Sequence, residues 1–468
     1  MAEKENIRLL VLEALIEIEK TDIFVKDALH KLLFQKQFLS KQDRAFITRM
    51  VEGVTEYRVR LDYIINCFSK TKVNKCKPLI RCVLRMGVYQ MLYMDSVPNE
   101  AACDECVKLT KKKGFQNLSG FVNGVLRSVN RGIGGIEYPD RKNNVAEYLS
   151  VTYSMPKWLV LEMLSWYGEE LTEKILKKSV TASDLTIRVN EDLITKEALM
   201  HKLLDKGIEV TEGNYVDEAL HLSNINYVKR LPGFKEGDFF IQDESSMLLY
   251  QIAGLFMEEK ERTDDRIQQE ASEKLRVLDL CAAPGGKCTQ FAQKLGEHAF
   301  VLARDLTEYK ISLINENISR LGLHNIETDV WDALVLDEEK IGWADVVIAD
   351  LPCSGLGIIS KKNDIKYHVT TKQLIELANL QRTILTNAAQ YVKPGGILLY
   401  STCTIHPEEN IMNAKWFLEH FDFDGEDIGA FLPEELKDSV QEKCMLQLLP
   451  GVHKCDGFFI AKFRRKED

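Results

Sequence analysis

Apolar residues at the start of the chain recur every three or four positions, the spacing that puts them on one face of a helix. The first run covers residues 7–18, and similar runs cover 46–68, 79–94 and 121–129. No stretch in this part of the sequence alternates between apolar and polar residues with the period of a strand. The pattern therefore predicts an all-α domain over residues 1–135.

A second region follows residues 132–139, where three glycines and a proline in eight residues predict a linker. Apolar runs of mixed period then indicate a small α+β module, which we assign to residues 150–240. Its expected elements are two helices within 156–178, a helix over 196–206, and strands at 185–190, 208–211 and 219–222.

The last region contains a charged stretch, 258–274, whose seven acidic and four basic side chains predict a solvated or disordered insertion. Beyond it, near-continuous apolar runs alternate with segments of helical period, which is typical of parallel strands buried on both faces. We therefore predict a doubly wound, Rossmann-like α/β domain over residues 241–468. The expected strands are 276–280, 300–305, 344–350 and 396–401, and the expected helices are 310–321 and 373–391.

The composition of the chain predicts where in the cell the protein is found. Of the 468 residues 45% are apolar, yet no apolar run reaches the roughly 18 residues that span a bilayer. The charged N-terminus is unlike a signal peptide. We expect a cytoplasmic, monomeric protein without membrane association, whose eleven cysteines are free thiols. Cys103 and Cys106 form a CxxC pair, but no second pair follows at zinc spacing, so no metal site is expected.

The net charge of −10 argues against a nucleic-acid partner until it is divided by region. Residues 1–140 carry 23 basic and 17 acidic side chains, a balance of +6, which leaves −16 for the remainder. The basic residues concentrate within 70–85 and 108–113. A basic N-terminal region can attract phosphates that the acidic remainder repels. Because ordinary surfaces vary by as much, charge alone leaves both interpretations open.

A glycine pair follows directly on the first strand of the α/β region. Adjacent glycines there let the backbone approach a nucleotide closely, although such a pair is more often a plain turn. The second strand ends in Asp305, where a carboxylate can accept both hydroxyls of a ribose. Turn and carboxylate together indicate an adenosine-containing ligand and leave NAD and S-adenosylmethionine both open. The turn consists of Cys281, Ala282, Ala283, Pro284, Gly285, Gly286 and Lys287.

A further carboxylate lies within residues 329–333, which follow a third strand between the expected strands 300–305 and 344–350. Asp332 is placed to accept a hydrogen bond from an adenine amino group. Asp329 and Asp337 compete for the same role, and a solvated loop carboxylate is the plain alternative.

Two more strand ends each carry a cysteine. Cys353 follows Asp350 at the end of one strand, and Cys403 follows the next. Ligands of an open α/β sheet bind beyond the carboxyl ends of the strands, so both thiols belong at the edge that holds the glycine turn. A lone cysteine is usually a small buried hydrophobe, but two at such strand ends suit a reaction that needs a thiolate.

Methylation of carbon 5 of a cytosine is such a reaction. That carbon is too electron-poor to attack a methyl sulfonium until a thiolate adds to carbon 6. A base must then remove the carbon-5 proton so that the thiolate can leave. A carboxyl group such as Asp350, near the ring nitrogen and amino group, would stabilise the charged adduct. The target must lie in a single strand or leave its helix.

At these residues the sequence resembles the Nop/Sun family of RNA cytosine-C5 methyltransferases. The resemblance is carried by residues 278–287, 350–355 and 401–410. It implies a class I S-adenosylmethionine methyltransferase domain in which Cys403 is the nucleophile and Cys353 assists product release. DNA cytosine-C5 methyltransferases, by contrast, use the Pro-Cys cysteine as nucleophile and lack the other. The residues expected to contact S-adenosyl-L-methionine are the 281–287 turn, Asp305, Asp332 and Asp350.

The N-terminal region resembles the NusB-type RNA-binding domain at residues 84–92, 97–100 and 121–127. Residues 188–190 and 242–246 are similar to the segment that precedes the catalytic domain in the Nop/Sun family. This arrangement is that of the bacterial Sun/Fmu (RsmB-type) enzymes, and it implies small-subunit ribosomal RNA as partner, with cytosine 967 as the target. Two alternatives stay open: a cytosine-C5 methyltransferase of transfer RNA or large-subunit RNA, and a non-catalytic NusB-like RNA-binding scaffold.

Overall fold

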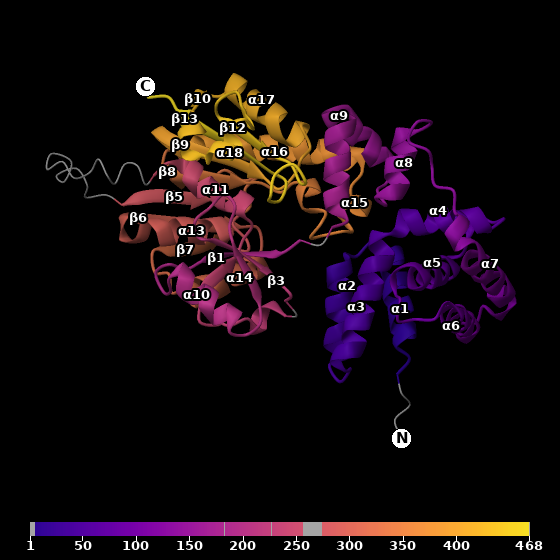
Figure 1. The fold of residues 1–468 in the computed structure, drawn as a ribbon. Coiled ribbons are helices and arrows are strands. Elements are labelled where there is room, and N and C mark those ends of the chain that lie inside the picture. Colours follow the sequence, from indigo (N-terminus) through magenta and orange to yellow (C-terminus); the bar gives the residue numbers. More distant parts are fainter. Residues whose placement is uncertain (1–4, 182, 226, 256–273, 468) are drawn as a thin grey trace. The chain divides into compact units, whose positions relative to one another are not determined.

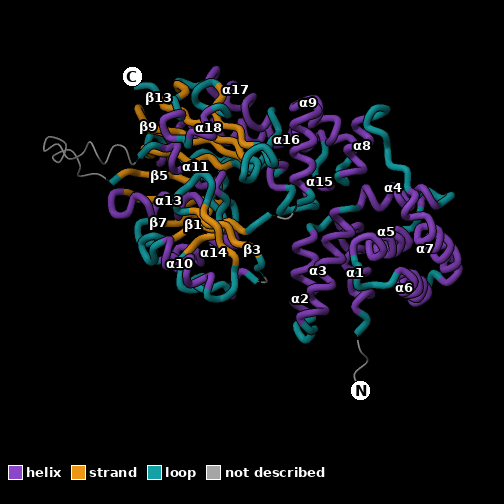
Figure 2. The backbone as a smooth tube through the Cα atoms, in the orientation of Figure 1, coloured by secondary structure: helices purple, strands orange, loops and turns teal. Residues whose placement is uncertain are grey.

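The computed structural model describes residues 5–181, 183–225, 227–255 and 274–467. The charged stretch predicted to be an insertion therefore lies, except for Lys274, outside the described residues. Figures 1 and 2 show helices in one part of the chain and a large sheet in another. The chain divides into two compact units, Met1–Thr181 with Ile359–His368 (the helical unit) and Ala182–Ile358 with Val369–Asp468 (the sheet unit). The three-part division into 1–135, 150–240 and 241–468 stays a prediction.

The helical unit is all-α in its described residues, as the apolar spacing predicted. Fully buried aliphatic side chains such as Val11, Val51 and Leu84 form its core. Gly168, with a φ of 71°, divides the last long helix, in agreement with the two helices predicted within 156–178. Its main helices are α1 (Ile7–Thr21), α2 (Val25–Gln35), α3 (Lys41–Glu56), α4 (Arg58–Phe68), α5 (Pro78–Tyr93), α6 (Asn99–Lys112), α7 (Ser119–Gly132), α8 (Val145–Thr152) and α9 (Lys157–Ser179).

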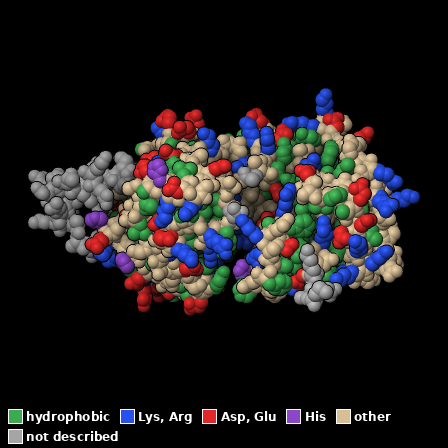
Figure 3. All heavy atoms as spheres, turned by 60° about the horizontal axis from the view of Figure 1, so that its bottom comes forward, with side chains coloured by type: hydrophobic (Ala, Val, Ile, Leu, Met, Phe, Trp, Pro, Cys, Tyr) green, Lys and Arg blue, Asp and Glu red, His purple; other side chains and the backbone are tan. Residues whose placement is uncertain are grey.

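The basic residues within 70–85 fall into two groups. Arg81 pairs with Glu19, and Arg85 pairs with Glu19 and with Asp62 at 2.6 Å, so these two guanidinium groups are neutralised within the unit. The lysines of the same stretch are exposed. Figure 3 shows basic side chains scattered over the visible face of this unit among acidic and apolar ones. The exposed lysines are Lys70, Lys72, Lys75 and Lys77.

A small antiparallel sheet opens the sheet unit, with strand order β2-β3-β1-β4. Ile187, Leu199 and Leu220 are fully buried between this sheet and its helix. Its elements are β1 (Leu185–Val189), α10 (Lys196–Leu204), β2 (Glu209–Glu212), β3 (Ala219–Ser223) and β4 (Phe239–Ile241).

The large sheet has the order β11-β12-β13-β9-β8-β5-β6-β7, with β10 paired to β13. Strands β9 to β7 are parallel, which confirms the predicted α/β fold, whereas the C-terminal strands are antiparallel. The strands are β5 (Leu275–Asp279), β6 (Ala299–Asp305), β7 (Ile326–Val330), β8 (Ala344–Asp350), β9 (Val392–Thr402), β10 (Phe423–Gly425), β11 (Val440–Gln441), β12 (Met445–Leu448) and β13 (Phe458–Arg465).

Helices cover both faces of this sheet. Val277 packs on one face with side chains of α11, α13 and α14, and Leu278 packs on the other with side chains of α16 and α17. Strand β5 lies between β8 and β6, so the strand order reverses there and opens a crevice at their carboxyl ends. The covering helices are α11 (Glu244–Ala253), α13 (Gly286–Leu295), α14 (Glu308–Leu321), α16 (Thr371–Tyr391) and α17 (Asn413–His420). Among the described helices, none is long and apolar enough to cross a bilayer.

The small sheet is held to α14 by a close backbone approach at Gly237. Asn190 donates from its side-chain amide to the carbonyl oxygens of Gly237 and Leu321, at 3.0 and 3.3 Å. Gly237 has a φ of 81°, and a Cβ atom there would lie 1.9 Å from the carbonyl oxygen of Arg320. Only glycine satisfies both constraints.

Replacing Gly237 with Ala is therefore expected to lower the free energy of unfolding by about 2 kcal/mol or more, because a steric clash adds to the backbone strain. Urea unfolding measures the loss. Gly207→Ala is the matched control, since Gly207 has a φ of 75° but open space around its Cβ position. Equal losses in the two variants would show that the close approach contributes nothing.

Candidate active site

A cavity of about 180 Å³ lies at the carboxyl ends of β5 and β8. Most of the predicted glycine turn lines it, together with Asp350. Gly285, Asp305 and Asp332 do not line it, and neither do the two predicted catalytic cysteines. The lining residues are Phe240, Ile241, Gln242, Asp243, Ser246, Asp279, Cys281, Ala282, Ala283, Pro284, Gly286, Lys287 and Asp350.

Arg188 of β1 holds the glycine turn through hydrogen bonds. Gly285 has a φ of 106°, and α13 begins at the next residue. Arg188 donates to the carbonyl oxygen of Gly286 at 2.8 Å, to Thr289 Oγ1 at 3.2 Å and to Gln242. Burial lowers the pKa of Arg188 to about 10. A buried cation with these acceptors fixes the path of the turn.

The carboxylate of Asp305 is tied to the same turn. Its Oδ2 accepts from the backbone N–H of Ala283 at 2.9 Å, and its Oδ1 accepts from Lys310 Nζ at 2.8 Å and from the Leu306 N–H at 2.7 Å. Asp305 is 3% exposed. The end of β6 and the turn after β5 therefore form one rigid edge.

The three carboxylates that competed for an adenine contact differ in their partners. Asp329 and Asp337 both pair with Arg304, at 3.1 and 2.7 Å. Asp332 is partly exposed, and its Oδ1 accepts only from the backbone N–H of Leu334, at 3.0 Å, among the described contacts. Of the three, Asp332 keeps the most acceptor capacity.

Asp279, the last residue of β5, is a site residue that sequence reasoning missed. It lines the cavity and is 1% exposed, and within the part of the chain that the structure describes no side chain hydrogen-bonds to it. Burial, reinforced by the nearby carboxylate of Asp350, raises the pKa of Asp279 to about 8. An acidic residue inside an apolar strand, Val277 to Leu280, was the signal that could have identified it.

Asp350 connects the cavity to the cysteines. Its Oδ2 accepts from Lys287 Nζ at 2.6 Å, and its Oδ1 accepts from Ser401 Oγ at 2.8 Å. The register of β8 against β9 places Asp350 opposite Ser401. The two cysteine turns therefore leave the sheet side by side.

The sulfur atoms of Cys353 and Cys403 lie 3.3 Å apart. The hydrogen bond with Cys403, together with burial, raises the pKa of the Cys353 thiol well above its usual range. At this separation either thiol can donate a hydrogen bond to the other sulfur. The sequence placed both thiols at one edge of the sheet, and the structure brings them into contact.

Glu409 fastens the two cysteine turns together. It is 0% exposed, and its Oε2 accepts from the backbone N–H of Ser354 at 2.9 Å and from Gln381 Nε2 at 3.0 Å. Ser354 Oγ and Thr404 Oγ1, each next to a cysteine, lie 2.7 Å apart. The sequence analysis assigned no role to Glu409, although it lies within the motif that contains Cys403.

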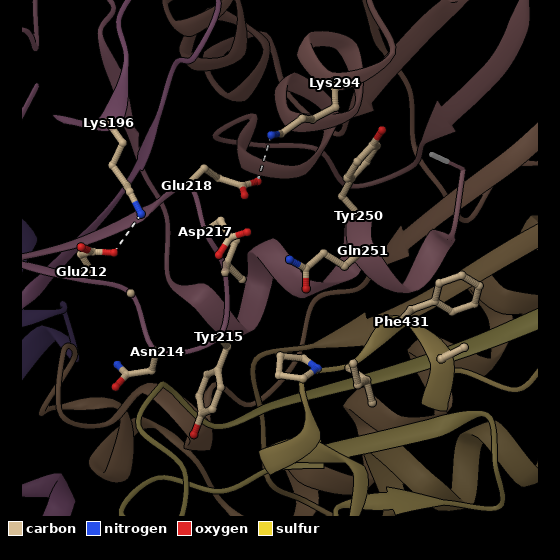
Figure 4. Close-up of a pocket in the computed structure, with 15 residues that line it drawn as sticks. Lys196, Glu212, Asn214, Tyr215, Asp217, Glu218, Tyr250, Gln251, Lys294 and Phe431 are labelled. Atoms are coloured by element: carbon tan, nitrogen blue, oxygen red, sulfur yellow. Dashed lines mark hydrogen bonds and ion pairs between the residues drawn. The ribbon is translucent and has the colours of Figure 1, made fainter. Parts of the chain in front are cut away.

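A larger cavity of about 650 Å³ lies elsewhere in the sheet unit and contains none of the predicted site residues. Figure 4 shows Lys196 pointing toward Glu212 and Lys294 toward Glu218 across it, at 2.9 and 3.5 Å. These four charged side chains of the cavity wall are thus paired with each other.

Comparisons with known proteins assign each part of the chain to a family. Residues 267–464 match the family described as 16S rRNA methyltransferase RsmB/F. Residues 5–131 match the NusB family, and residues 155–229 match an RsmF/B-like ferredoxin-like domain.

Similar whole chains include a probable ribosomal RNA small subunit methyltransferase B of Bacillus subtilis, 35% identical over 99% of both chains. The crystal structure of PH0851 shares the fold, with a TM-score of 0.76 and 24% identity over 99% of this chain and all of that one. The crystal structure of NSun6 from Pyrococcus horikoshii with SFG has a TM-score of 0.56 and 22% identity, and covers 67% of this chain and 99% of its own.

The raised pKa of Asp279 predicts a pH-dependent effect of Asp279→Asn. In the unfolded chain the group titrates near its ordinary value of 3.8, and in the folded chain near about 8. Between these values the folded state binds more protons, so the wild type loses stability as pH rises from about 4 to 8. Asparagine removes this loss, so the variant should gain on the order of 2–4 kcal/mol relative to wild type between about pH 5 and pH 8. Urea midpoints of both proteins at these pH values measure the gain, and a difference that does not change with pH would contradict it.

Proposed function

The chain belongs to the RsmB/F family of 16S rRNA methyltransferases, and we propose that it methylates carbon 5 of cytosine 967 of small-subunit ribosomal RNA through a covalent adduct with Cys403. The family makes it an S-adenosylmethionine-dependent ribosomal RNA methyltransferase. The observation that carries the proposed chemistry is the 3.3 Å separation of the Cys353 and Cys403 sulfurs.

The nucleophile assignment rests on the resemblance of the motif around Cys403 to that of the Nop/Sun enzymes, and it is supported by the contact between the two thiols. Because the two sulfurs lie within hydrogen-bonding distance, an S–H on Cys353 can stabilise a thiolate on Cys403. That thiolate adds to carbon 6 of the cytosine and makes carbon 5 nucleophilic. Asp350, which lies between the cavity and the thiols, would hold the ring nitrogen and amino group of the adduct.

Release of the product requires the carbon-5 proton to leave and the Cys403–carbon 6 bond to break. We assign assistance of this step to Cys353, in line with the resemblance of its motif to that of the Nop/Sun enzymes. The sulfur of Cys353 contacts the sulfur of Cys403. A displacement of Cys353 therefore changes the surroundings of the bond between Cys403 and carbon 6, which must break. Ser354 and Glu409 hold it in this place.

The residues around the cavity fit S-adenosyl-L-methionine. That molecule supplies the methyl group on a sulfonium centre and carries an ammonium group. Asp279 and Asp350 are carboxylates on the cavity wall, and Asp279 has no side-chain partner among the described residues, so a cation is the ligand it lacks. The backbone of the 281–287 turn, Asp305 for the ribose and Asp332 for the adenine complete the proposed set.

The exposed lysines within 70–85 support RNA binding by the NusB-like part. Transcripts of small-subunit RNA and of transfer RNA, offered to the purified protein, separate the proposed substrate from the alternative of transfer RNA. Mapping of the methylated cytosine then tests position 967. Methylation of transfer RNA alone would overturn the substrate assignment.

Cys403→Ala is expected to lower methyl transfer by about a thousandfold or more, because no other group can add to carbon 6. Its affinity for S-adenosylmethionine, measured by calorimetry, should stay within about twofold of wild type, which is a small difference in binding energy. Cys67→Ser is the control, since Cys67 is an exposed thiol of the helical unit. Turnover near the wild-type rate in Cys403→Ala would remove the nucleophile assignment.

Cys353→Ala should instead trap the enzyme on its RNA, because the adduct forms through Cys403 but is released slowly. The measurement is a denaturing gel of enzyme incubated with S-adenosylmethionine and RNA. The double variant that also lacks Cys403 should show no band of raised mass. A single variant that turns over without such a band would rule out the release role.

A further inference from the structure

Ten residues that follow the Cys353 turn, Ile359–His368, belong to the helical unit, although the chain on both sides of them belongs to the sheet unit. They end in the short helix α15 (Ile365–His368). The segment has no apolar periodicity of its own, and most of its side chains are polar or charged. What holds it is a set of contacts with the ends of helices.

Asp364 serves as the missing cap of α2. The residue before that helix, Phe24, offers no side-chain cap. The carboxylate of Asp364 accepts from the backbone N–H of Val25, the first residue of the helix, at 2.6 Å. An anion at a helix N-terminus is favourable both as a hydrogen-bond acceptor and through the helix dipole. Asp364 is 5% exposed, so this contact is shielded from water.

Lys366 makes the complementary contact at the end of α3. Its ammonium donates to the carbonyl oxygen of Glu56, the last residue of that helix, at 2.9 Å. Lys366 is 0% exposed. A cation at a helix C-terminus has the favourable sign. The segment thus presents an anion to one helix start and a cation to another helix end, two residues apart.

Aromatic contacts complete the attachment. The guanidinium of Arg58 lies 3.8 Å from the centre of the Tyr367 ring. The rings of His368 and Phe24 are 4.2 Å apart, and His368 Nδ1 lies 3.2 Å from a carboxylate oxygen of Asp22. These contacts reach α1, α2 and α4 together, so the segment is attached to several helices of its unit.

Gly357, two residues before the segment, is fixed to the turn that contains Cys403. The N–H of Gly357 donates to the carbonyl oxygen of Cys403 at 3.1 Å, and the carbonyl oxygen of Gly357 accepts from Gly457 at 2.9 Å. A Cβ atom at Gly357 would lie 2.1 Å from the carbonyl oxygen of Gly457. Between this anchor and Asp364, only Lys361 and Lys362 are exposed.

We propose that residues 359–368 act as a strut through which the helical unit positions Cys353, and that Asp364 and Lys366 are positioning residues for product release. The inference rests on the release role proposed above for Cys353. The strut links the helical unit, which resembles an RNA-binding domain, to the turn that contains Cys353. The position of this turn matters while the adduct breaks down. A purely structural role would stabilise the helical unit and leave the release step unchanged.

Lengthening the strut separates the two roles. Insertion of Gly-Ser-Gly-Ser between Lys361 and Lys362 leaves both anchors intact, and exposed turns tolerate such insertions. The same insertion between Lys142 and Asn143, exposed residues of the helical unit, is the control. Each full-length protein is given S-adenosylmethionine and a small-subunit RNA transcript. Single-turnover methyl transfer, multiple turnover, the gel-stable adduct and the melting temperature are measured.

The strut insertion is expected to slow multiple turnover about tenfold or more and to accumulate adduct, because small displacements of a reacting group have effects of this size. Single-turnover transfer should stay within about twofold of wild type. The control insertion should change none of these. A strut insertion with a normal melting temperature and wild-type adduct levels would overturn the inference.

Substitutions of Asp364 and Lys366 test the role of the strut independently. They are the decisive test if the insertion lowers the melting temperature. Asp364→Ala and Lys366→Met should accumulate adduct, Asp364→Asn should restore release in part because its amide oxygen can accept from Val25, and Lys362→Met should behave as wild type. Absence of adduct in folded Asp364→Ala, with adduct present in Cys353→Ala, overturns the strut alone. Absence of adduct in Cys353→Ala as well overturns the release role and the strut with it.

Discussion

The parallel pairing of β8 with β9 sets the distance between the two thiols, and much of the site follows from it. Neighbouring strands lie about 4.8 Å apart, so turns that leave them at the same level start close together. The register that puts Asp350 opposite Ser401 supplies that common level, and the hydrogen bond between these side chains holds it at the point where the strands end. A slip of one residue would send every side chain of β9 to the opposite face of the sheet. The 3.3 Å contact between the two sulfurs therefore depends on the register of β8 against β9 as well as on the cysteines themselves.

Much of this arrangement could be predicted from the sequence because buried parallel strands are continuous apolar runs. The glycine turn, Asp305 and both cysteines follow such strands directly, and the carboxyl ends of parallel strands meet at one edge. The antiparallel strands β10 to β12 were not predicted, since they are two to four residues long and carry no periodic signal. The apolar run 46–68 has helical spacing throughout, as predicted, but it is divided between α3 and α4, and the chain turns at Tyr57. The attachment of Ile359–His368 could not be foreseen, because it depends on helix ends that are distant in sequence.

Two buried carboxylates of the sheet unit, Glu409 and Asp279, differ in whether the protein supplies them with hydrogen-bond donors. Glu409 accepts through its Oε2 from Ser354 and Gln381, and its Oε1 lies 3.2 Å from His406 Nδ1, so much of the free-energy cost of burying this carboxylate is recovered within the structure. Asp279 has no side-chain donor among the described residues, and the protein retains a proton there instead. A carboxylate of the first kind maintains the geometry of its neighbours. A carboxylate without donors, such as Asp279, lowers the stability of the fold until a cation binds beside it. Such a residue is typical of a ligand-binding site.

The course of the chain between its two units also limits how the protein could have been assembled from parts. The chain passes from one unit to the other after Thr181, again after Ile358 and once more after His368. A gene fusion that joined a ready-made helical domain to a ready-made methyltransferase would need only the first of these passages. The other two mean that exchanging the helical domain for another would also require a new set of residues in the middle of the catalytic sequence.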